Sequence, residues 1–386
     1  MGKPLVSVVV PTKNRYPYLF KLIELMDSFA TEEVELVITD NNDDNTPMLE
    51  FFKEHGKADY IVYKHQVGQV SMSENSDRAI LNSSGEYVCF IGDDDAVTKY
   101  VVDCARWMKR HNIEIVVPSD LSYKWPDFIT SVETEKASLK YSPFTGEIKS
   151  IDCKEVLNEI MDRGFVDRGR LPLAYHGVAK RETLDKIYET CHTFYPGPSP
   201  DIANGVALSL VADNYYSVSL PIVISGASAT HGGGIRTKKN HASDIDDIPF
   251  MPKGTKQKWE KNIPLIWTGS TIWCESAIKA LRAMHREDLI QKVNFEYFYV
   301  YTMAYYPAAR KMAFDLSSNK IAAFLKYMGL FCNRVFNYGV RLIKGKLGVN
   351  PTSSEKEYNN VENIVDAYKI ILKDYQQDFI DNYLKK

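Results

Sequence analysis

The first 118 residues alternate two kinds of segment, and this alternation limits the possible folds more than any other feature of the sequence. Runs rich in β-branched and aromatic residues predict five strands, at 6–10, 34–39, 60–64, 87–91 and 113–117. Stretches with helical periodicity separate these runs. Such alternation produces βαβ units and a mainly parallel sheet. We therefore expect an α/β fold with a Rossmann-like sheet.

The rest of the chain has a different pattern. Residues 119–150 are polar and aromatic without a clear period, which indicates loops or short antiparallel strands. Residues 174–179 predict an edge strand and 215–224 a further strand, and from about residue 252 the pattern is almost wholly helical. The 386 residues suffice for two domains. The expected units are 1–245, with halves 1–118 and 119–245, and a helical domain at 253–386.

The composition excludes several classes of protein. A hydrophobic content of 45% and a charged content of 25% are typical of a soluble globular protein. The net charge of −3 gives no general attraction for nucleic acid. Six scattered cysteines without a CxxC pair favour free thiols in a reducing compartment. Because no apolar stretch reaches the roughly 18–20 residues of a membrane span and the N-terminal lead is too short for a signal peptide, we expect a cytoplasmic protein.

Three predicted strands end in polar residues. Asp93, Asp94 and Asp95 follow the fourth strand, Asp40 to Asn42 follow the second, and Pro11 to Arg15 follow the first. In a parallel sheet these ends meet at one edge, where open α/β folds bind ligands. The amides and Asp40 could bind a base and ribose, Arg15 a phosphate, and the triplet a cation such as Mn²⁺ or Mg²⁺. Alternatively, each cluster is a turn, or the triplet caps the next helix.

Two phosphate-binding motifs are absent from the sequence. No GxGxxG follows the first strand, and no GxxxxGK[ST] occurs anywhere in the chain. A Rossmann dinucleotide site and a Walker-type NTPase are therefore disfavoured. Without a glycine loop, a metal must neutralise a bound diphosphate, which favours the cation interpretation of the triplet.

Three segments resemble family 2 glycosyltransferases of the GT-A fold, namely 7–15, 37–42 and 85–95. Residues 75–80 are similar to the branch that includes bacterial O-antigen and capsule sugar transferases, although the usual Ala-Arg-Asn-x-Gly segment is absent. The resemblance implies a hexosyltransferase that inverts the anomeric centre. It would move a sugar from a nucleotide-diphosphate donor, with UDP expected, to a saccharide or lipid-linked saccharide acceptor in surface polysaccharide synthesis.

The resemblance also implies roles for single residues. The donor-binding residues would be Pro11, Thr12, Asn14, Arg15, Asp40, Asn42, Asn75, Arg78, Asp93 and Asp94. Asp93 and Asp95 would form the DxD pair that contacts ribose and metal, with His231 as a further metal ligand, although which two aspartates act stays open. Asp201 would be the general base. It is also the expected N-cap of a helix, while Asp213 and Asp120 are weaker candidates for the base and His176 is a second histidine candidate.

The helical region has two unusual segments. The aromatic segment 297–306 is typical of a core or of an oligomer interface, so a homo-oligomer is one expectation. No acidic residue occurs between Asp315 and Glu355, where basic and apolar residues are interleaved. Residues 316–354 therefore predict either peripheral contact with the inner face of the cell membrane or a helical hairpin with a solvated basic face.

Two other functions remain open at this point. A sugar-nucleotide nucleotidyltransferase shares the parallel sheet and the metal carboxylates, but it would carry a glycine-rich basic loop after the first strand. A non-catalytic protein that binds nucleotide sugars or glycans would not need a base such as Asp201.

Overall fold

The computed structural model describes residues 2–68, 70–128, 137–229, 242–248, 251–346 and 354–385, without the side chains of 341–346. Its main element is an eight-stranded sheet in the order β3-β2-β1-β4-β10-β6-β11-β9. The bounds are β1 Val6–Thr12, β2 Val34–Asp40, β3 Ile61–His65, β4 Tyr87–Phe90, β6 Ile115–Pro118, β9 Ile148–Asp152, β10 Val178–Lys180 and β11 Asn214–Val218. Strands β3, β2, β1 and β4 are parallel neighbours, as are β6 and β11. The predicted α/β, mainly parallel sheet is confirmed.

The register of the parallel strands brings their carboxyl ends together. Thr12 at the end of β1 pairs with Asp40 at the end of β2, and Val9 pairs with Phe90 at the end of β4. Every residue of β2, and every residue of β1 except Pro11, is buried. Both faces of this part of the sheet are therefore covered, as the uninterrupted apolar run of β1 predicts.

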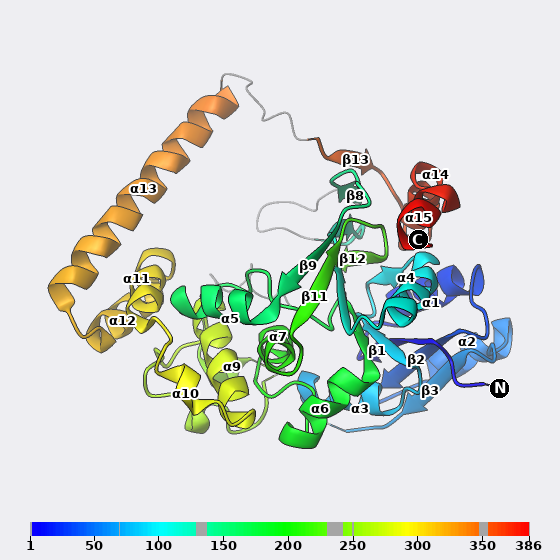
Figure 1. Cartoon of the computed structure of the whole chain (residues 1–386), viewed down its shortest axis with the longest axis horizontal. Coiled ribbons are helices and arrows are strands. Elements are labelled where there is room, and N and C mark those ends of the chain that lie inside the picture. Colours follow the sequence, from blue (N-terminus) through cyan, green and yellow to red (C-terminus); the bar gives the residue numbers. More distant parts are fainter. Residues whose placement is uncertain are drawn as a thin grey trace.

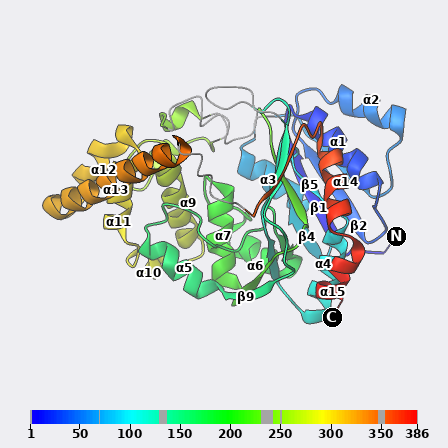
Figure 2. The same ribbon diagram turned by 90° about the horizontal axis from the view of Figure 1, so that it is seen from above.

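Helices cover both faces of the sheet (Figure 2). The first four are α1 Tyr16–Asp27, α2 Thr46–His55, α3 Met72–Leu81 and α4 Tyr100–His111. Helix α3 begins with a capping box, in which Ser71 and Glu74 satisfy each other's backbone N–H groups. Helix α4 begins only at Tyr100, because Ala96–Val97 just before it forms β5 and pairs with another strand.

Two predicted strands differ from the structure. The segment 174–179 was expected at an edge, but its end forms β10, which lies in the middle of the sheet and is antiparallel to both β4 and β6. The predicted strand 215–224 is two strands, β11 and β12 (Val223–Ala227), which belong to different sheets. Pro221 between them has no N–H for a strand ladder, which favours the change of sheet.

A second sheet shares a hydrophobic core with the first. Its order is β13-β8-β7-β12-β5, with β7 at Leu121–Lys124, β8 at Ser138–Tyr141 and β13 at Lys356–Asn359. Strands β7 and β8 are antiparallel, which confirms the expectation of short antiparallel strands for the described part of 119–150. Strand β12 brings residues 225–228 beside the end of β4.

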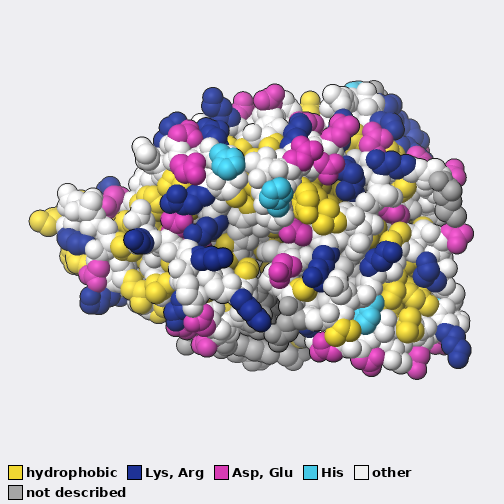
Figure 3. Space-filling model, turned by 90° about the horizontal axis from the view of Figure 1, so that it is seen from below, with side chains coloured by type: hydrophobic (Ala, Val, Ile, Leu, Met, Phe, Trp, Pro, Cys, Tyr) yellow, Lys and Arg dark blue, Asp and Glu magenta, His cyan; other side chains and the backbone are white. Residues whose placement is uncertain are grey.

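The helical region shares a hydrophobic core with α5 (Cys153–Asp162) and with the helix that begins at Pro200. It contains α9 Gly269–Ala283, α11 Phe295–Tyr305, α12 Arg310–Leu316 and the long α13 Lys320–Lys346. Helix α9 packs against α7 (Pro200–Val211), and α13 projects away from the sheet (Figure 1). No helix in the described ranges is long and apolar enough to cross a bilayer. Figure 3 shows acidic and basic side chains interspersed over one face, as expected for a net charge near zero.

The last residues return to the sheet domain. Strand β13 pairs with β8, and α14 (Ile364–Asp374) packs against α1. Helix α15 (Gln377–Leu384) packs against α4, so both chain ends lie on the same side of the molecule (Figure 1). The division into 1–245 and 253–386 stays a prediction, and the core contacts of residues 361–384 belong to the sheet domain.

Candidate active site

The acidic triplet lies in the loop after β4, between the end of that strand and β5. Asp93, Asp94 and Asp95 are 2%, 3% and 1% exposed, although each carries a carboxylate. Buried carboxylates persist only with hydrogen-bond donors or cations beside them. The fold supplies these from β1, from β12 and from the segment before β10.

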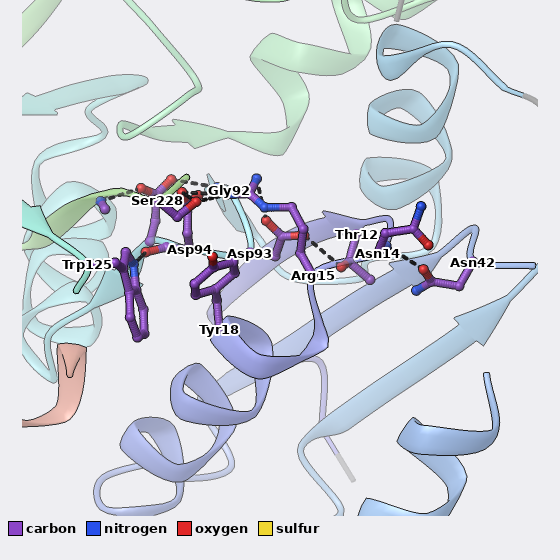
Figure 4. A network of polar contacts seen from close by, with 12 residues as sticks. Thr12, Asn14, Arg15, Tyr18, Asn42, Gly92, Asp93, Asp94, Trp125 and Ser228 are labelled. Carbon is purple, nitrogen blue, oxygen red and sulfur yellow. Dashed lines mark hydrogen bonds and ion pairs between the residues drawn. The ribbon is translucent and has the colours of Figure 1, made fainter. Parts of the chain in front are cut away.

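Arg15 bridges the first two aspartates of the triplet (Figure 4). One guanidinium nitrogen lies 2.8 Å from Asp93 Oδ1, and another forms an ion pair with Asp94 Oδ2. Thr12 donates a hydrogen bond of 2.7 Å to Asp93 Oδ2. Ser228, next to β12, donates to Asp94 Oδ2 and accepts from Arg15, each at 2.7 Å. The polar ends of β1 and β4 thus form one cluster, as the sheet topology predicts.

Asp95 points to a different set of partners. His176 Nε2 lies 2.6 Å from Asp95 Oδ2, and the Tyr175 hydroxyl donates to the same oxygen at 3.0 Å. The backbone N–H groups of Gly92 and Gly226 donate to this carboxylate at 2.7 Å each. Four donors therefore surround Asp95, and His176 is the histidine that the structure brings to the triplet.

The pKa values of this cluster follow from burial and charge. Burial disfavours the ionised form of Asp95, but His176 and the N–H donors outweigh it and hold the pKa below its ordinary value. Burial acts against protonation of His176, but Asp95 and then Asp201 raise its pKa. Burial raises the pKa of Asp93, and the charge of Arg15 opposes this only in part. The positive charge beside the triplet is therefore smaller than the negative charge of three ionised carboxylates.

Asp40 anchors a second network at the end of β2. Its Oδ2 accepts hydrogen bonds of 2.6 Å from the hydroxyls of Tyr16 and Tyr63. Its Oδ1 accepts from the backbone and the side chain of Asn42, at 2.8 and 2.6 Å. Asn42 in turn accepts the backbone N–H of Asn14, whose φ of 61° lies in the left-handed region. These four donors fill the acceptor sites of Asp40, so its clearest role in this structure is to fix Asn42 and Asn14.

The remaining predicted donor-binding residues lie near the ends of β1 and β2 or on α3. Pro11 is half-buried in β1 opposite Thr39. Asn75 on α3 donates to the Thr39 carbonyl at 3.4 Å, and its buried Oδ1 has no hydrogen-bond partner among the described residues. Arg78 is half-buried one turn later on the same helix. An acceptor such as Asn75 Oδ1, buried without a donor, is a position where a ligand N–H or O–H would be stabilised.

Asp201 lies in the first turn of α7, and the N-cap is Ser199, so the expectation that Asp201 caps the helix is wrong. The carboxylate is close enough to His176 and Tyr175 for its charge to raise the pKa of both groups. The other candidates for the base differ in position. Asp213 is exposed just beyond the opposite end of α7, about 18 Å away along a helix of 12 residues. Asp120 is exposed between β6 and β7.

The predicted metal site is incomplete in the described part of the chain. His231 lies outside the described residues. Within them, no three His, Cys, Asp or Glu side chains converge as ligands of an ion. The oxygen ligands suit Mn²⁺ or Mg²⁺ in kind, but Arg15 occupies Asp93 and Asp94, and Asp95 already has four donors. The residues as arranged therefore do not fit a resident cation unless Arg15 turns away.

Sequence reasoning did not include several residues that contact the triplet. Gly226 and Ser228 lie more than 130 residues further along the chain than the triplet. Trp125 donates from its indole to the Asp94 backbone carbonyl at 2.9 Å, and the Tyr18 ring lies 5.5 Å from the Arg15 guanidinium (Figure 4). The position of Ser228 after a predicted strand could have marked it as a candidate site residue, but only the fold shows that it contacts Asp94.

Comparison with known proteins finds a family match for the N-terminal part of the chain. Residues 7–159 match the model of glycosyl transferase family 2. These residues form a family 2 glycosyltransferase domain. Together with the observed sheet, the match confirms the predicted GT-A-type fold class, followed by a largely helical region.

Individual relatives are more distant. A GalNAc(5)-diNAcBac-PP-undecaprenol beta-1,3-glucosyltransferase of Campylobacter jejuni is 30% identical over 95 residues, which are 24% of this chain and 30% of that relative. The chain thus matches less than a third of that relative's length. Solved structures of S. aureus TarS also align. TarS 1–349 in complex with UDP-GlcNAc has a TM-score of 0.44 and 15% sequence identity, and the alignment covers 85% of this chain and 89% of that chain. The structure of TarS has a TM-score of 0.43 and 15% identity, and the alignment covers 85% of this chain and 54% of that chain.

Proposed function

We propose that this protein is a glycosyltransferase that moves a sugar from a nucleotide-diphosphate donor to a saccharide or lipid-linked saccharide acceptor. The observation that carries the proposal is the family 2 domain with Thr12, Arg15 and the triplet joined in one buried polar cluster at the carboxyl edge of its sheet. Ligands bind at this edge in open α/β folds. A nucleotidyltransferase is disfavoured by the same family match.

The donor would lie across the ends of β1, β2 and β4. Asn14, Asn42 and Asn75 offer amide groups for the nucleoside, and the unpartnered Oδ1 of Asn75 suits a donor N–H or O–H. Arg15 would hold the diphosphate, with Arg78 as a second cation. Uridine diphosphate sugars are the first donors to test. A cytoplasmic location is part of the proposal, and it agrees with six free cysteines.

Asp201 would act as the general base. It accepts the proton of the acceptor hydroxyl as that oxygen forms a bond to the anomeric carbon of the donor. The bond from this carbon to the diphosphate breaks in the same step, so the configuration inverts and the nucleoside diphosphate leaves. His176 contacts Asp95, its pKa is raised by the charges of Asp95 and Asp201, and it would help to keep the base in place. Dependence on Mn²⁺ or Mg²⁺ is a separate question, because Arg15 forms ion pairs with two of the three carboxylates.

The test is a transfer assay with the purified full chain and a panel of nucleotide sugars. Release of nucleoside diphosphate together with a glycosylated product detected by mass spectrometry supports the proposal. Asp201→Asn is expected to lower kcat by about 10²–10⁴-fold, the range for loss of a general base. Asp213→Asn, an exposed change beyond the other end of α7, is the matched control and should leave kcat near wild type. Donor binding without product from any acceptor class would instead support the non-catalytic alternative.

A further inference from the structure

Helix α13 is only partly packed against the rest of the protein. Its 27 residues extend over about 40 Å. Ala323 and Tyr327 are buried in the core of the helical region, and Leu330 packs beside them. Arg334 donates a hydrogen bond of 2.8 Å to the Ala304 carbonyl. One face of the helix is thus fixed to the protein, while the rest projects into solvent (Figure 1).

The projecting surface is apolar rather than basic. Eight large hydrophobic side chains are 38–76% exposed, and we call them the apolar stripe: Ile321, Phe324, Leu325, Met328, Phe331, Val335, Phe336 and Tyr338. At 100° per residue they cover one continuous arc of about 160°. The described part of this segment is one continuous helix and not the alternative hairpin, while the solvated basic face stays a prediction. A contiguous apolar surface of this kind marks a site of interaction.

Charge selects the partner. Between Asp315 and Glu355 the sequence has no acidic residue but six basic ones: Lys320, Lys326, Arg334, Arg341, Lys344 and Lys346. A second copy of α13 would bring two basic helices together with no acidic partner on either, and like charges repel. An anionic lipid surface offers the opposite charge together with an apolar layer. The helix cannot cross a bilayer, so it would lie along the surface.

We infer that α13 docks the protein on an anionic membrane surface, with the apolar stripe inserted between the lipid headgroups. The polar face, which includes Asn333 and Asn337, then points away from the lipid. This inference does not depend on the proposed transfer reaction, because binding to vesicles is measurable without donor or acceptor.

The exposed Cys332 allows a direct measurement. It lies within the arc of the apolar stripe, between Ile321 and Leu325 in helical angle, whereas Cys191 is half-buried and the other four cysteines are buried. An environment-sensitive fluorophore on Cys332, in a Cys191→Ser background, should shift to shorter wavelength when vesicles with 30% phosphatidylglycerol are added. A quencher confined to the lipid phase should reduce its emission. No shift and no quenching would overturn the inference.

Matched double variants separate insertion from a general effect of charge. Leu325→Glu with Val335→Glu adds two negative charges within the apolar stripe, and Asn333→Glu with Asn337→Glu adds the same two on the polar face. About 1 kcal/mol per charge near a lipid surface corresponds to about fivefold in partitioning, so the stripe variant should bind at least about 25-fold more weakly in flotation. The control residues lie about one helix diameter, roughly 10 Å, further from the lipid, where screening leaves an effect of a few-fold at most.

The outcomes are distinct. Flotation of wild type and of the polar-face variant with phosphatidylglycerol vesicles, but not with pure phosphatidylcholine, supports the inference. Equal flotation of both double variants would overturn it. The inference would also be overturned if the wild type does not bind vesicles and sediments as a dimer, while the stripe variant sediments as a monomer. The apolar stripe would then bind a second copy of the chain. Circular dichroism melting of each variant establishes that it is folded.

Discussion

Replacing Arg15 by Met tests the electrostatic account of the triplet. Methionine approximates the length and volume of the side chain but leaves Asp93 and Asp94 without their cation. The guanidinium lies 2.8 Å from Asp93 and contacts Asp94 as well, with charge centres about 4 Å apart in each pair. At an effective dielectric constant of about 20, each pair contributes about 4 kcal/mol of gross attraction.

The net effect is smaller than this sum. Arg15 is itself largely buried, and its desolvation costs several kcal/mol that are recovered in the variant. Removal of one partner from a buried ion pair typically lowers stability by about 3–5 kcal/mol, because a buried charge is left unpaired. We therefore expect Arg15→Met to lower the free energy of unfolding by about 3–5 kcal/mol. Arg15→Lys keeps the charge but loses the forked geometry, so it should lose less.

Addition of Mn²⁺ makes the experiment decisive for the cation question. The carboxylates that Arg15 occupies in wild type are available to an ion in Arg15→Met. At an ion concentration of 100 times Kd, the ion would stabilise the variant by about 2.7 kcal/mol, and wild type by much less. Urea unfolding of the three proteins, in EDTA and in Mn²⁺, measures both quantities.

Two results would refute the reasoning about Arg15. A loss below about 1 kcal/mol in Arg15→Met would mean that the ion pairs contribute little to stability. Equal stabilisation of wild type and variant by Mn²⁺ would mean that Arg15 and the ion do not compete for the same oxygens.

Three further predictions concern single residues. Gly226→Ala would place a methyl carbon 1.7 Å from the Asp94 backbone oxygen, so β12 must shift, and both stability and transfer should fall; retention of wild-type melting and activity would contradict the contact. Burial raises the pKa of Glu275 to about 7 from 4.5, so its protonated form favours the fold and stability should fall as pH rises through this interval. Glu275→Gln should remove up to about 3 kcal/mol of that fall, measured by urea unfolding at pH 4.5 and 8, and an unchanged difference would exclude Glu275 as its source. Asn75→Leu removes the unpartnered acceptor Oδ1 and should weaken nucleotide binding in a thermal-shift assay by about 1 kcal/mol, or about fivefold, with Asn158→Leu at an exposed helical position as the control; equal binding by both variants would contradict the role of Asn75.

Local patterns predict the parallel half of the sheet well. Strands such as β1 and β2 are buried on both faces, so their apolar runs are uninterrupted and recognisable. Strand β10 has only three residues, and its place between β4 and β6 depends on pairing with residues more than 60 positions away. No local periodicity contains that information, which explains why the edge position assigned to this segment was wrong.

The candidate site likewise contains some residues that the sequence predicts and others that only the fold reveals. Arg15 and the triplet are visible in the sequence because each directly follows a predicted strand. Ser228 is 213 residues from Arg15, and only the folded β12 brings them together. The position of His176 beside Asp95 depends on a left-handed backbone conformation with φ of 60°, which the sequence does not indicate for a histidine. Roles for these residues in transfer stay predictions until the variants are assayed.

The return of residues 356–384 to the sheet domain has a consequence for how the protein is made. Buried side chains of α14 and α15, such as Ile364, Ile371 and Ile380, complete the same core as α1 and α4. During synthesis, the domain that begins at β1 cannot close its core until residue 384 has left the ribosome, more than 350 residues after the first strand. Nascent chains that stop after α13 would expose this core and should be captured by chaperones or degraded. The helical region is an insertion between two parts of the sheet domain that must come together, so C-terminal truncation should abolish folding of the sheet domain.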